Sequence, residues 1–391
     1  MNKRPYKNSG EELSLLGFGC MRLPRLYEDK QDIDYTRGQE LIDYAYAHGV
    51  NYFDTAYPYH GGESENFVGC ALKKYPRETF YLADKMPSWL VKNLGDGKRI
   101  FAEQLQKCQV AYFDFYLCHS ISTLDEFVKR YEDTGVLNYL RQEKKDGRIR
   151  HLGFSFHGTP DVLEQLVDRH EWDFVQIQLN YLDWDMQNAK KEYEMLEKRG
   201  IPCTVMEPVR GGSLCNLSEE SVRILKTERP DQSLASWAIR FAASLPNVIT
   251  VLSGMSALDQ VEDNVKTLTD FEALTQRDHA VLEQAVTAYL KAGTIPCTGC
   301  RYCMDCPAGV DIPKVFAVYN ECATANHLPI SFAGSESYAK NAKLFSAAYE
   351  TIPAENRAEH CVGCEKCMKH CPQHIEIPAR MREINELAAG L

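Results

Sequence analysis

Between about residues 13 and 268 the sequence repeats one unit, in which a helix is followed by a glycine and then by a short apolar strand. In the clearest copy, a helix expected over 36–48 ends at Gly49 and a strand follows over 51–54. The other expected strands are 13–18, 79–84, 113–118, 148–155, 174–178, 201–207 and 248–252. The other helices of the repeat fit 64–74, 98–110, 136–146, 160–169, 188–199, 233–243 and 257–268.

Strands and helices that alternate in this way indicate a parallel sheet with helical crossovers. About eight units in roughly 260 residues match a closed (β/α)8 barrel, for which ~250 residues are typical. An open doubly wound sheet is the alternative, but no G-x-G-x-x-G motif follows the first strand. The sequence therefore predicts an α/β fold, a TIM barrel followed by a smaller domain.

Composition narrows the class of protein. Of 391 residues 44% are hydrophobic, which is ample for a large core, and the net charge is −11 without a basic tract, so nucleic acid is not expected as a partner. The N-terminal segment has no apolar signal region and no run reaches membrane-spanning length, so we expect a cytoplasmic protein that does not enter a membrane. Without a signal peptide, the fifteen clustered cysteines suggest metal binding more than disulfides.

Polar residues follow several of the expected strands at the point where each strand ends. Asp54 ends the strand 51–54, Lys85 closes FYLADK, and His119 closes FDFYLCH. Tyr59 lies in a loop five residues after Asp54. The active sites of TIM barrels lie at the carboxyl ends of the strands. These four side chains together therefore predict a site for proton transfer, whereas any one of them alone would be an ordinary buried polar group.

The sequence contains the segments DTAYPYHGGESE, LADK, YLCH, GFS and QLNY, one after another in this order. In these segments and in their order the sequence resembles the aldo-keto reductase family, over roughly residues 10–270. The resemblance implies that Tyr59 is the general acid, that Lys85 tunes it, that Asp54 holds the lysine and that His119 orients the substrate carbonyl. A free tyrosine, with a pKa of ~10, donates poorly at neutral pH, and a nearby ammonium group lowers that pKa. Tyr57 is the competing candidate for the acid.

The resemblance also implies a nicotinamide dinucleotide at the barrel mouth. Ser155 and Gln178 match residues that hold the nicotinamide carboxamide, although Phe156 stands where the family has an asparagine. Met206 takes the position of the tyrosine that stacks on the nicotinamide in many relatives, and methionine is a softer platform.

The phosphate-binding positions depart from the family pattern. Gly254 and Gln260 stand where many relatives carry Lys and Arg for the 2′-phosphate of NADP, and Arg210 is the nearest basic alternative. The glycine turn at Gly211 and Gly212 is expected to bring backbone N–H groups to the pyrophosphate, with an ordinary tight turn as the alternative, and the resemblance assigns Asp263 and Asn264 to the adenine. NADP remains the expected cofactor, with NAD as the alternative.

After the barrel, the sequence predicts a linking helix and a tail domain. We expect the barrel over 1–272, the linking helix over 273–293 and the tail over 294–391. Two cysteine runs mark the tail, and both are followed by proline. The first run is Cys297, Cys300, Cys303 and Cys306, and the second is Cys361, Cys364, Cys367 and Cys371.

The second run has the C-x2-C-x2-C-x3-C-P spacing of bacterial ferredoxins, and the last gap of the first run is one residue shorter. We expect two [4Fe–4S] clusters, with zinc sites and disulfides as alternatives. In two-cluster ferredoxins the fourth cysteine of one run ligates the other cluster. We therefore expect Cys371 to join the first run and Cys306 to join the second, and the alternative is that each run holds its own cluster. Helices expected over 315–326 and 337–349 make the tail resemble an α-helical ferredoxin.

The combined expectation is an NAD(P)H-dependent oxidoreductase that reduces an aldehyde or ketone, or runs in reverse, fused to a two-cluster electron-transfer domain. Its partners would be a small carbonyl or alcohol substrate and a ferredoxin or flavoprotein that exchanges electrons. Hydride transfer moves two electrons and a cluster moves one, and no flavin motif is found to join them. The alternatives are therefore an electron-transfer or redox-sensing protein with the barrel as scaffold, or clusters that are purely structural.

Overall fold

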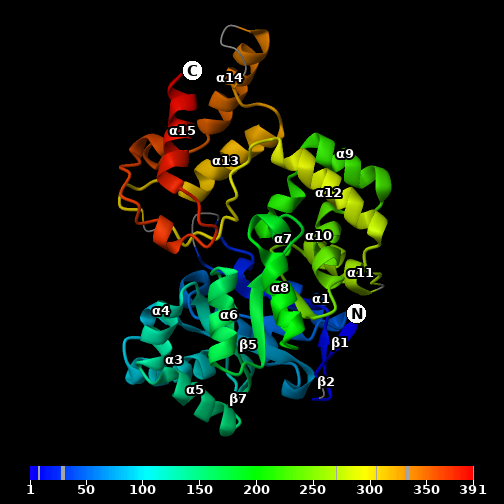
Figure 1. The fold of residues 1–391 in the computed structure, drawn as a ribbon, viewed down its shortest axis with the longest axis vertical. Helices are drawn as coiled ribbons and strands as arrows, with labels where there is room; N and C mark the ends of the chain where they lie inside the picture. The colour runs from blue at the N-terminus through cyan, green and yellow to red at the C-terminus, as the bar shows by residue number, and fades with distance from the viewer. Residues whose placement is uncertain (8, 28–30, 270, 305, 331–334, 391) are drawn as a thin grey trace. The chain divides into compact units, whose positions relative to one another are not determined.

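The structure is a computed structural model, and it describes all residues of the chain except 8, 28–30, 270, 305, 331–334 and 391. Eight parallel strands close into a barrel in the order β10-β3-β4-β5-β6-β7-β8-β9, which confirms the predicted TIM barrel and not the open sheet (Figure 1). The strands are β3 (Leu16–Gly19), β4 (Tyr52–Asp54), β5 (Tyr81–Pro87), β6 (Phe113–Ile121), β7 (Ile149–Phe156), β8 (Phe174–Gln178), β9 (Cys203–Met206) and β10 (Val248–Gly254).

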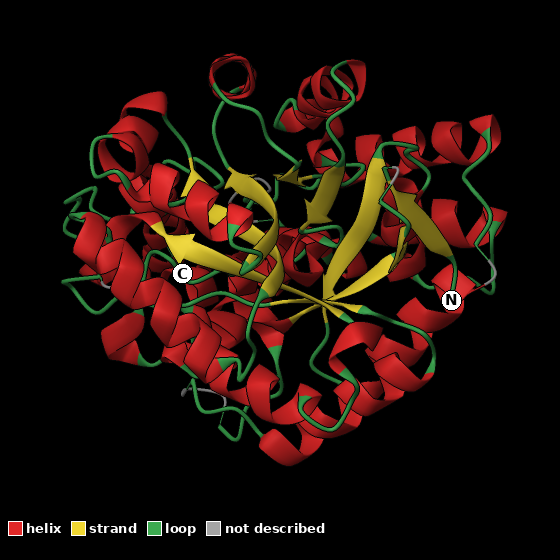
Figure 2. Ribbon diagram, turned by 90° about the horizontal axis from the view of Figure 1, so that it is seen from below, coloured by secondary structure: helices red, strands yellow, loops and turns green. Residues whose placement is uncertain are grey.

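Helices alternate with these strands and surround them, as Figure 2 shows by the red helices around the yellow strands. The barrel helices are α1 (Tyr35–Ala47), α2 (Ser64–Leu72), α3 (Leu94–Lys107), α5 (Val136–Lys145), α6 (Pro160–Arg169), α8 (Ala189–Lys198), α10 (Leu234–Ala243) and α11 (Leu258–Thr269). The short helices α4 (Leu124–Phe127) and α7 (Asp183–Met186) were not predicted. Gly49 ends the first repeat with φ +89°, a conformation that glycine adopts without steric cost.

The single strand expected over 13–18 is wrong, because the chain turns within it. Glu11–Ser14 (β2) pairs antiparallel with Lys3–Tyr6 (β1), and only the residues from Leu16 onward enter the barrel as β3. The side chain of Ser14 bridges the change of direction, since its Oγ donates to the Leu16 carbonyl oxygen at 2.6 Å. An apolar run of this kind shows strand propensity but not the point at which the partner strand changes.

The hairpin belongs to the core at the amino end of the barrel. Tyr6 and Leu13 of the hairpin are buried in one cluster with Tyr52, Phe115 and Phe174, which lie in the first half of their strands. Apolar side chains therefore fill this end of the barrel. The carboxyl ends of the strands are the ones that carry the polar residues found in the sequence.

The chain divides into two compact units. The first is Met1–Val209 with Ala235–Leu274, and the second is Arg210–Leu234 with Thr275–Leu391. The second unit holds α9 (Glu219–Glu228), α12 (Gln276–Leu290), α13 (Ile312–Thr324), α14 (Glu336–Tyr349) and α15 (Ile377–Ala389). Compactness of packing does not mark folding domains by itself, so the boundaries expected at 272 and 293 stay a prediction.

Helices α9 and α12 pack side by side within the second unit. The Oγ of Ser221 donates to the Ala285 carbonyl oxygen at 2.8 Å, and the guanidinium of Arg229 contacts both carboxylate oxygens of Asp278 at 2.7 and 2.8 Å. Thr275 and Asp278 form a capping box at the start of α12. Helix α12 is thus bound to α9, which lies in the sequence between the barrel strands β9 and β10.

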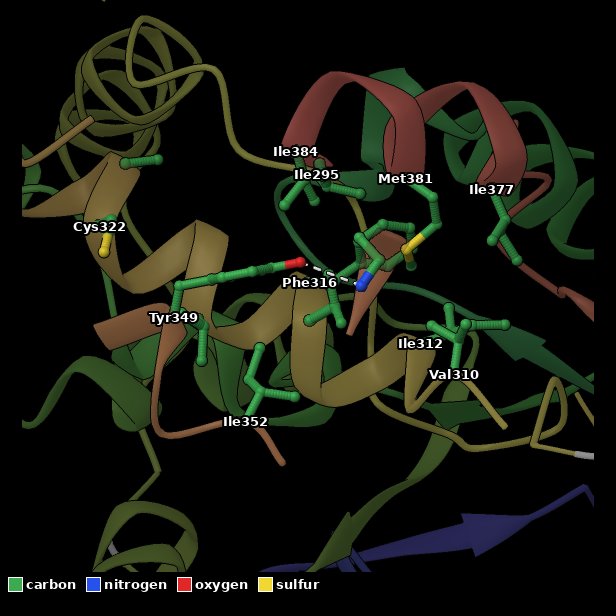
Figure 3. Close-up of a cluster of buried hydrophobic side chains, with 14 of the residues drawn as sticks. Ile295, Val310, Ile312, Phe316, Cys322, Tyr349, Ile352, Ile377, Met381 and Ile384 are labelled. Carbon is green, nitrogen blue, oxygen red and sulfur yellow. Dashed lines mark hydrogen bonds between the residues drawn. The ribbon is translucent and has the colours of Figure 1, made fainter. Parts of the chain in front are cut away.

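The tail has its own hydrophobic core. Phe316, Ile352, Met381 and Ile384 are buried in one cluster, and Figure 3 shows these side chains gathered around α13 and α15. The amide of Ala358 donates to the Tyr349 hydroxyl at 3.0 Å. Helices were predicted near α13 and α14, but α15 was missed. Both α13 and α15 begin with Ile-Pro, so the proline at the first turn was the signal that could have found it.

Among the described residues, no helix is long and apolar enough to cross a membrane.

Candidate active site

Three of the predicted residues form a buried hydrogen-bonded chain at the strand ends. The fully buried Lys85 Nζ lies 2.5 Å from Oδ1 of Asp54 and donates to the carbonyl oxygen of Thr55 at 2.7 Å. The same ammonium donates to the hydroxyl oxygen of Tyr59 at 3.4 Å. Tyr59 begins a tight turn, η2 (Tyr59–Gly62), in which His60 and Gly61 both have positive φ. This turn brings the phenol back over the end of β4.

The competing tyrosine has a different partner. The hydroxyl of Tyr57 donates to Oε2 of Glu103 at 3.0 Å, and Glu103 lies on the barrel helix α3. Of the two phenols, Tyr59 is therefore the one that is hydrogen-bonded to Lys85.

The pKa of Tyr59 moves in the direction opposite to the one expected. Burial is the largest cause, and Asp54 and Glu207 add to it, so that the pKa of Tyr59 is raised well above its usual value. Burial and these carboxylates act against the lowering expected from the Lys85 ammonium, and the tuning role of Lys85 stays a prediction. Burial also raises the pKa of Asp54, and Lys85 opposes that rise. Tyr59 therefore keeps its proton at neutral pH.

His119 lies in β6 and faces the same point. Its ring centre is 6.1 Å from that of Tyr59 and 5.3 Å from that of Trp89. The pKa of His119 is lowered well below its usual value, mainly by burial and further by the charges of Lys85 and His157. The imidazole is therefore neutral. Its Nδ1 is buried with no hydrogen-bond partner among the described residues. A neutral imidazole has one N–H to offer to a carbonyl oxygen.

The residues expected around the nicotinamide follow on the next three strands. Ser155 lies in β7, where its Oγ accepts from the amide of Ser120 at 2.7 Å. Gln178 and Met206 are register partners at the ends of β8 and β9, so they lie side by side. The Nε2 of Gln178 donates to Oδ2 of Asp183 at 2.8 Å. Phe156, at the position of the family's asparagine, is buried and has no side-chain amide to offer to the nicotinamide.

The residues expected at the phosphates and adenine lie around the end of β10. Gly254 is the exposed last residue of β10, and Gln260 accepts from the amide of Ser256 at 2.9 Å. Asn264 is buried and donates to the Ser253 hydroxyl at 3.0 Å. Asp263 lies beside it on α11 and is partly exposed.

Arg210, the basic alternative expected for the 2′-phosphate, is buried. It begins the turn η6 (Arg210–Cys215), which also contains Gly211 and Gly212 and belongs to the second compact unit. The Arg210 side chain is buried, and its Nη2 donates to Oε1 of Gln373 at 3.3 Å. Gln373 follows Cys371 by two residues, so this guanidinium contacts the loop of the second cysteine run.

The cysteines of the tail gather in two groups that each mix the two runs. Burial and the neighbouring thiols of Cys300, Cys297 and Cys371 raise the pKa of Cys303. Burial also raises the pKa of Cys367, and its neighbouring thiols are those of Cys361, Cys306 and Cys364. A pocket lined by this second group of four is closed by Val310, Ile312 and Met381.

The cysteine side chains of neither group converge on the position of a single metal ion. Of the residues that the structure describes, no three His, Cys, Asp or Glu side chains are gathered as they are around one metal ion. Four thiolates can hold either a zinc ion or a [4Fe–4S] cluster, so the grouping by itself is compatible with both.

Comparison with known proteins decides the family. The family model for the "Aldo/keto reductase family" matches residues 15–287. The chain belongs to the aldo/keto reductase family. A second model, "4Fe-4S dicluster domain", matches residues 296–376. The protein is thus an aldo/keto reductase-family oxidoreductase fused to an iron–sulfur domain, as predicted.

Three relatives of this aldo/keto reductase each match about three quarters of the chain. An L-galactose dehydrogenase from Arabidopsis thaliana is 24% identical over 318 residues, which are 75% of this chain and 96% of the relative. An NADH-specific methylglyoxal reductase from Escherichia coli is 27% identical over 328 residues, 72% of this chain and 98% of the relative. Among solved structures, the holo form of aldo-keto reductase AKR11C1 from Bacillus halodurans matches with a TM-score of 0.61 and 25% identity, over 73% of this chain and 96% of that chain.

The sequence reasoning missed one charged pair in this aldo/keto reductase. Arg22 and Glu207 form an ion pair, with 3.5 Å between Nη2 and Oε1, just past the ends of β3 and β9. Glu207 is also one of the groups that raise the pKa of Tyr59. The signal was available, because Glu207 directly follows β9 and Arg22 lies three residues after β3, both near the strand ends that revealed Asp54 and His119.

Proposed function

We propose that the barrel reduces a small aldehyde or ketone with NADPH or NADH, or oxidises the corresponding alcohol, and that the tail holds two [4Fe–4S] clusters. One observation carries the first part of the proposal. The buried chain Asp54–Lys85–Tyr59 ends in a phenol at the carboxyl ends of the strands, with the neutral His119 ring beside it.

The residues of the chain supply the proton chemistry. Tyr59 keeps its proton at rest and gives it to the substrate oxygen, and Lys85 stabilises the tyrosinate left behind because its ammonium donates to that oxygen. Asp54 keeps Lys85 in place. The N–H of His119 would orient the carbonyl oxygen. A bound nicotinamide dinucleotide supplies the hydride.

The residues fit such a dinucleotide in part. Ser155 and Gln178 offer a hydroxyl and an amide to the nicotinamide carboxamide, and Met206 offers an apolar surface beside them. Asp263 and Asn264 remain the proposed adenine contacts. Gly211 and Gly212 remain proposed pyrophosphate contacts, although their turn is shared with the buried Arg210.

Discrimination between the two nucleotides is expected to be weak. Gly254 and Gln260 carry no charge for a 2′-phosphate, and a phosphate paired with arginine is a strong charge-assisted contact. The Escherichia coli relative is named as NADH-specific, which supports NADH as a working alternative. Measured as the ratio of kcat/KM, the preference for NADPH over NADH should stay below about a thousandfold, since each tenfold requires a further ~1.4 kcal/mol of selective contact. A larger preference would mean that a phosphate site exists elsewhere.

For the clusters we propose mixed ligand sets, Cys297, Cys300, Cys303 and Cys371 for one and Cys361, Cys364, Cys367 and Cys306 for the other. The grouping of thiols around Cys303 and around Cys367 supports this assignment. Such clusters pass single electrons, so a ferredoxin or flavoprotein is the proposed partner. Because thiolate ligands must stay reduced, the proposed compartment is the cytoplasm.

Two anaerobic measurements test the function with the full-length protein. Oxidation of NADPH or NADH on addition of simple aldehydes is the expected result, and failure across a panel of aldehydes and ketones would contradict it. The second measurement is the visible absorbance of the clusters with NADPH or NADH alone. Bleaching without a carbonyl compound would favour an electron-transfer role, whereas turnover without any change of the clusters would favour structural clusters.

A further inference from the structure

The ion pair between Arg22 and Glu207 spans the end of one barrel strand. In the barrel β10 lies between β9 and β3. Glu207 directly follows β9, and Arg22 ends the turn η1 (Cys20–Arg22) directly after β3. A side chain that joins the two must therefore pass over the end of β10.

Gly254 at the end of β10 makes room for this side chain. A Cβ on Gly254 would lie 3.1–3.2 Å from the Cβ, Cγ and Cδ of Arg22, closer than most real contacts. The aliphatic stem of Arg22 therefore lies against the strand end, at the position where many relatives were expected to carry lysine. The stem thus takes the space that a side chain at position 254 would need, and the guanidinium beyond it pairs with Glu207.

The position of Glu207 is fixed by its surroundings. Its backbone has φ +54°, which is rare outside glycine, and its carbonyl oxygen accepts from Nδ2 of Asn180 at 3.1 Å. Its Oε2 is buried with no hydrogen-bond partner among the described residues. A carboxylate held in this way aims the guanidinium, while 31% of the Arg22 side chain stays exposed and can be reached by a ligand.

We propose that Arg22 binds a phosphate group of the dinucleotide and that Glu207 holds the guanidinium over Gly254 for this purpose. The proposal rests on the function proposed above. A guanidinium presents a planar fork of donors that matches phosphate oxygens, and it remains charged in proteins. The group bound is either the pyrophosphate, which both nucleotides share, or the 2′-phosphate, which only NADPH carries.

The test is nucleotide binding by the full-length protein with its clusters, measured anaerobically by fluorescence titration with NADPH and with NADH. Arg22→Gln should weaken binding roughly 10- to 100-fold, the usual range for loss of a hydrogen bond to a charged group. An equal loss for both nucleotides assigns Arg22 to the pyrophosphate, and a loss for NADPH alone assigns it to the 2′-phosphate. Unchanged or tighter binding of both by this variant overturns the proposal.

A matched control removes the same charge elsewhere on the first unit. The side chain of Arg199 is 27% exposed and pairs with Glu164 and Asp168 at 3.0 and 2.9 Å, at the helix end that leads into β9. Arg199→Gln should leave both affinities unchanged, and an equal loss there would reduce the Arg22 effect to net charge and overturn the proposal. If Arg22→Gln does not fold, as judged by circular dichroism and iron content, Arg22→Lys carries the test. That variant keeps the charge but not the fork, so a loss of several-fold is expected, and no loss counts against the proposal.

The two proposals fail in different ways. A wild-type protein that binds neither nucleotide overturns both the proposed function and the role of Arg22. A wild-type protein that binds nucleotide as tightly as its Arg22→Gln and Arg22→Lys variants overturns only the role of Arg22.

Discussion

Tyr59→Phe should lower kcat/KM for carbonyl reduction roughly 100- to 10,000-fold, the range that loss of a general acid typically gives. The variant removes the hydroxyl that lies 3.4 Å from Lys85 Nζ and keeps the ring, so the affinity for NADPH should change by no more than about twofold. Steady-state kinetics under anaerobic conditions, with nucleotide binding measured separately, distinguish the two effects.

Tyr57→Phe is the matched control, because it removes the same hydroxyl from a neighbouring position in the same loop. That hydroxyl donates to Glu103 on α3, so its loss should cost less than about tenfold in kcat/KM. If Tyr57→Phe were the damaging change and Tyr59→Phe the mild one, the acid would be Tyr57.

Cys371→Ser should remove the cluster of the first cysteine run, although Cys371 lies in the second. We expect the iron content to fall from about eight to about four atoms per chain, because each [4Fe–4S] cluster carries four irons. The electron paramagnetic resonance signal that disappears should be the one lost in Cys303→Ser. Conversely, Cys306→Ser should lose the same signal as Cys367→Ser.

This grouping separates the mixed arrangement from the alternative in which each run holds its own cluster. In that alternative Cys371→Ser would match Cys367→Ser instead. Cys322→Ser is the control, since Cys322 is buried in the hydrophobic core of the tail and belongs to neither run. It should retain both signals and the full iron content.

The barrel and its polar strand ends were readable from the sequence for one physical reason. Parallel strands followed by helices bring their carboxyl ends to one side, so residues as far apart as Asp54 and His119 fall together once the alternation is recognised. The cysteine spacings were similarly informative, because their geometry is local. The side chains of Asp54, Tyr59, Lys85 and His119 lie near one another at the strand ends, while their catalytic roles stay a prediction.

What the sequence did not reveal depends on contacts made in three dimensions. Burial outweighs the ammonium of Lys85 and raises the pKa of Tyr59, and burial cannot be read from a loop sequence. The contact of Arg210 with Gln373 joins two segments of the second unit that lie more than 160 residues apart in the sequence. Arg22 was overlooked because its role requires Glu207 and Gly254, which are distant in sequence and meet only around β10.

The division of the chain into compact units bears on how such a fusion is inherited. The chain passes between the units at 209/210, 234/235 and 274/275, whereas the two family matches meet between 287 and 296. Helix α9 and most of α12 thus fall within the stretch that matches the reductase family, yet they pack as part of the cluster-bearing unit. A recombination event that moved only the residues after 293 to another reductase would leave both helices behind. The transferred domain would then lack the two helices of its unit. It could be joined only to reductases whose helices at the positions of α9 and α12 resemble those of this chain.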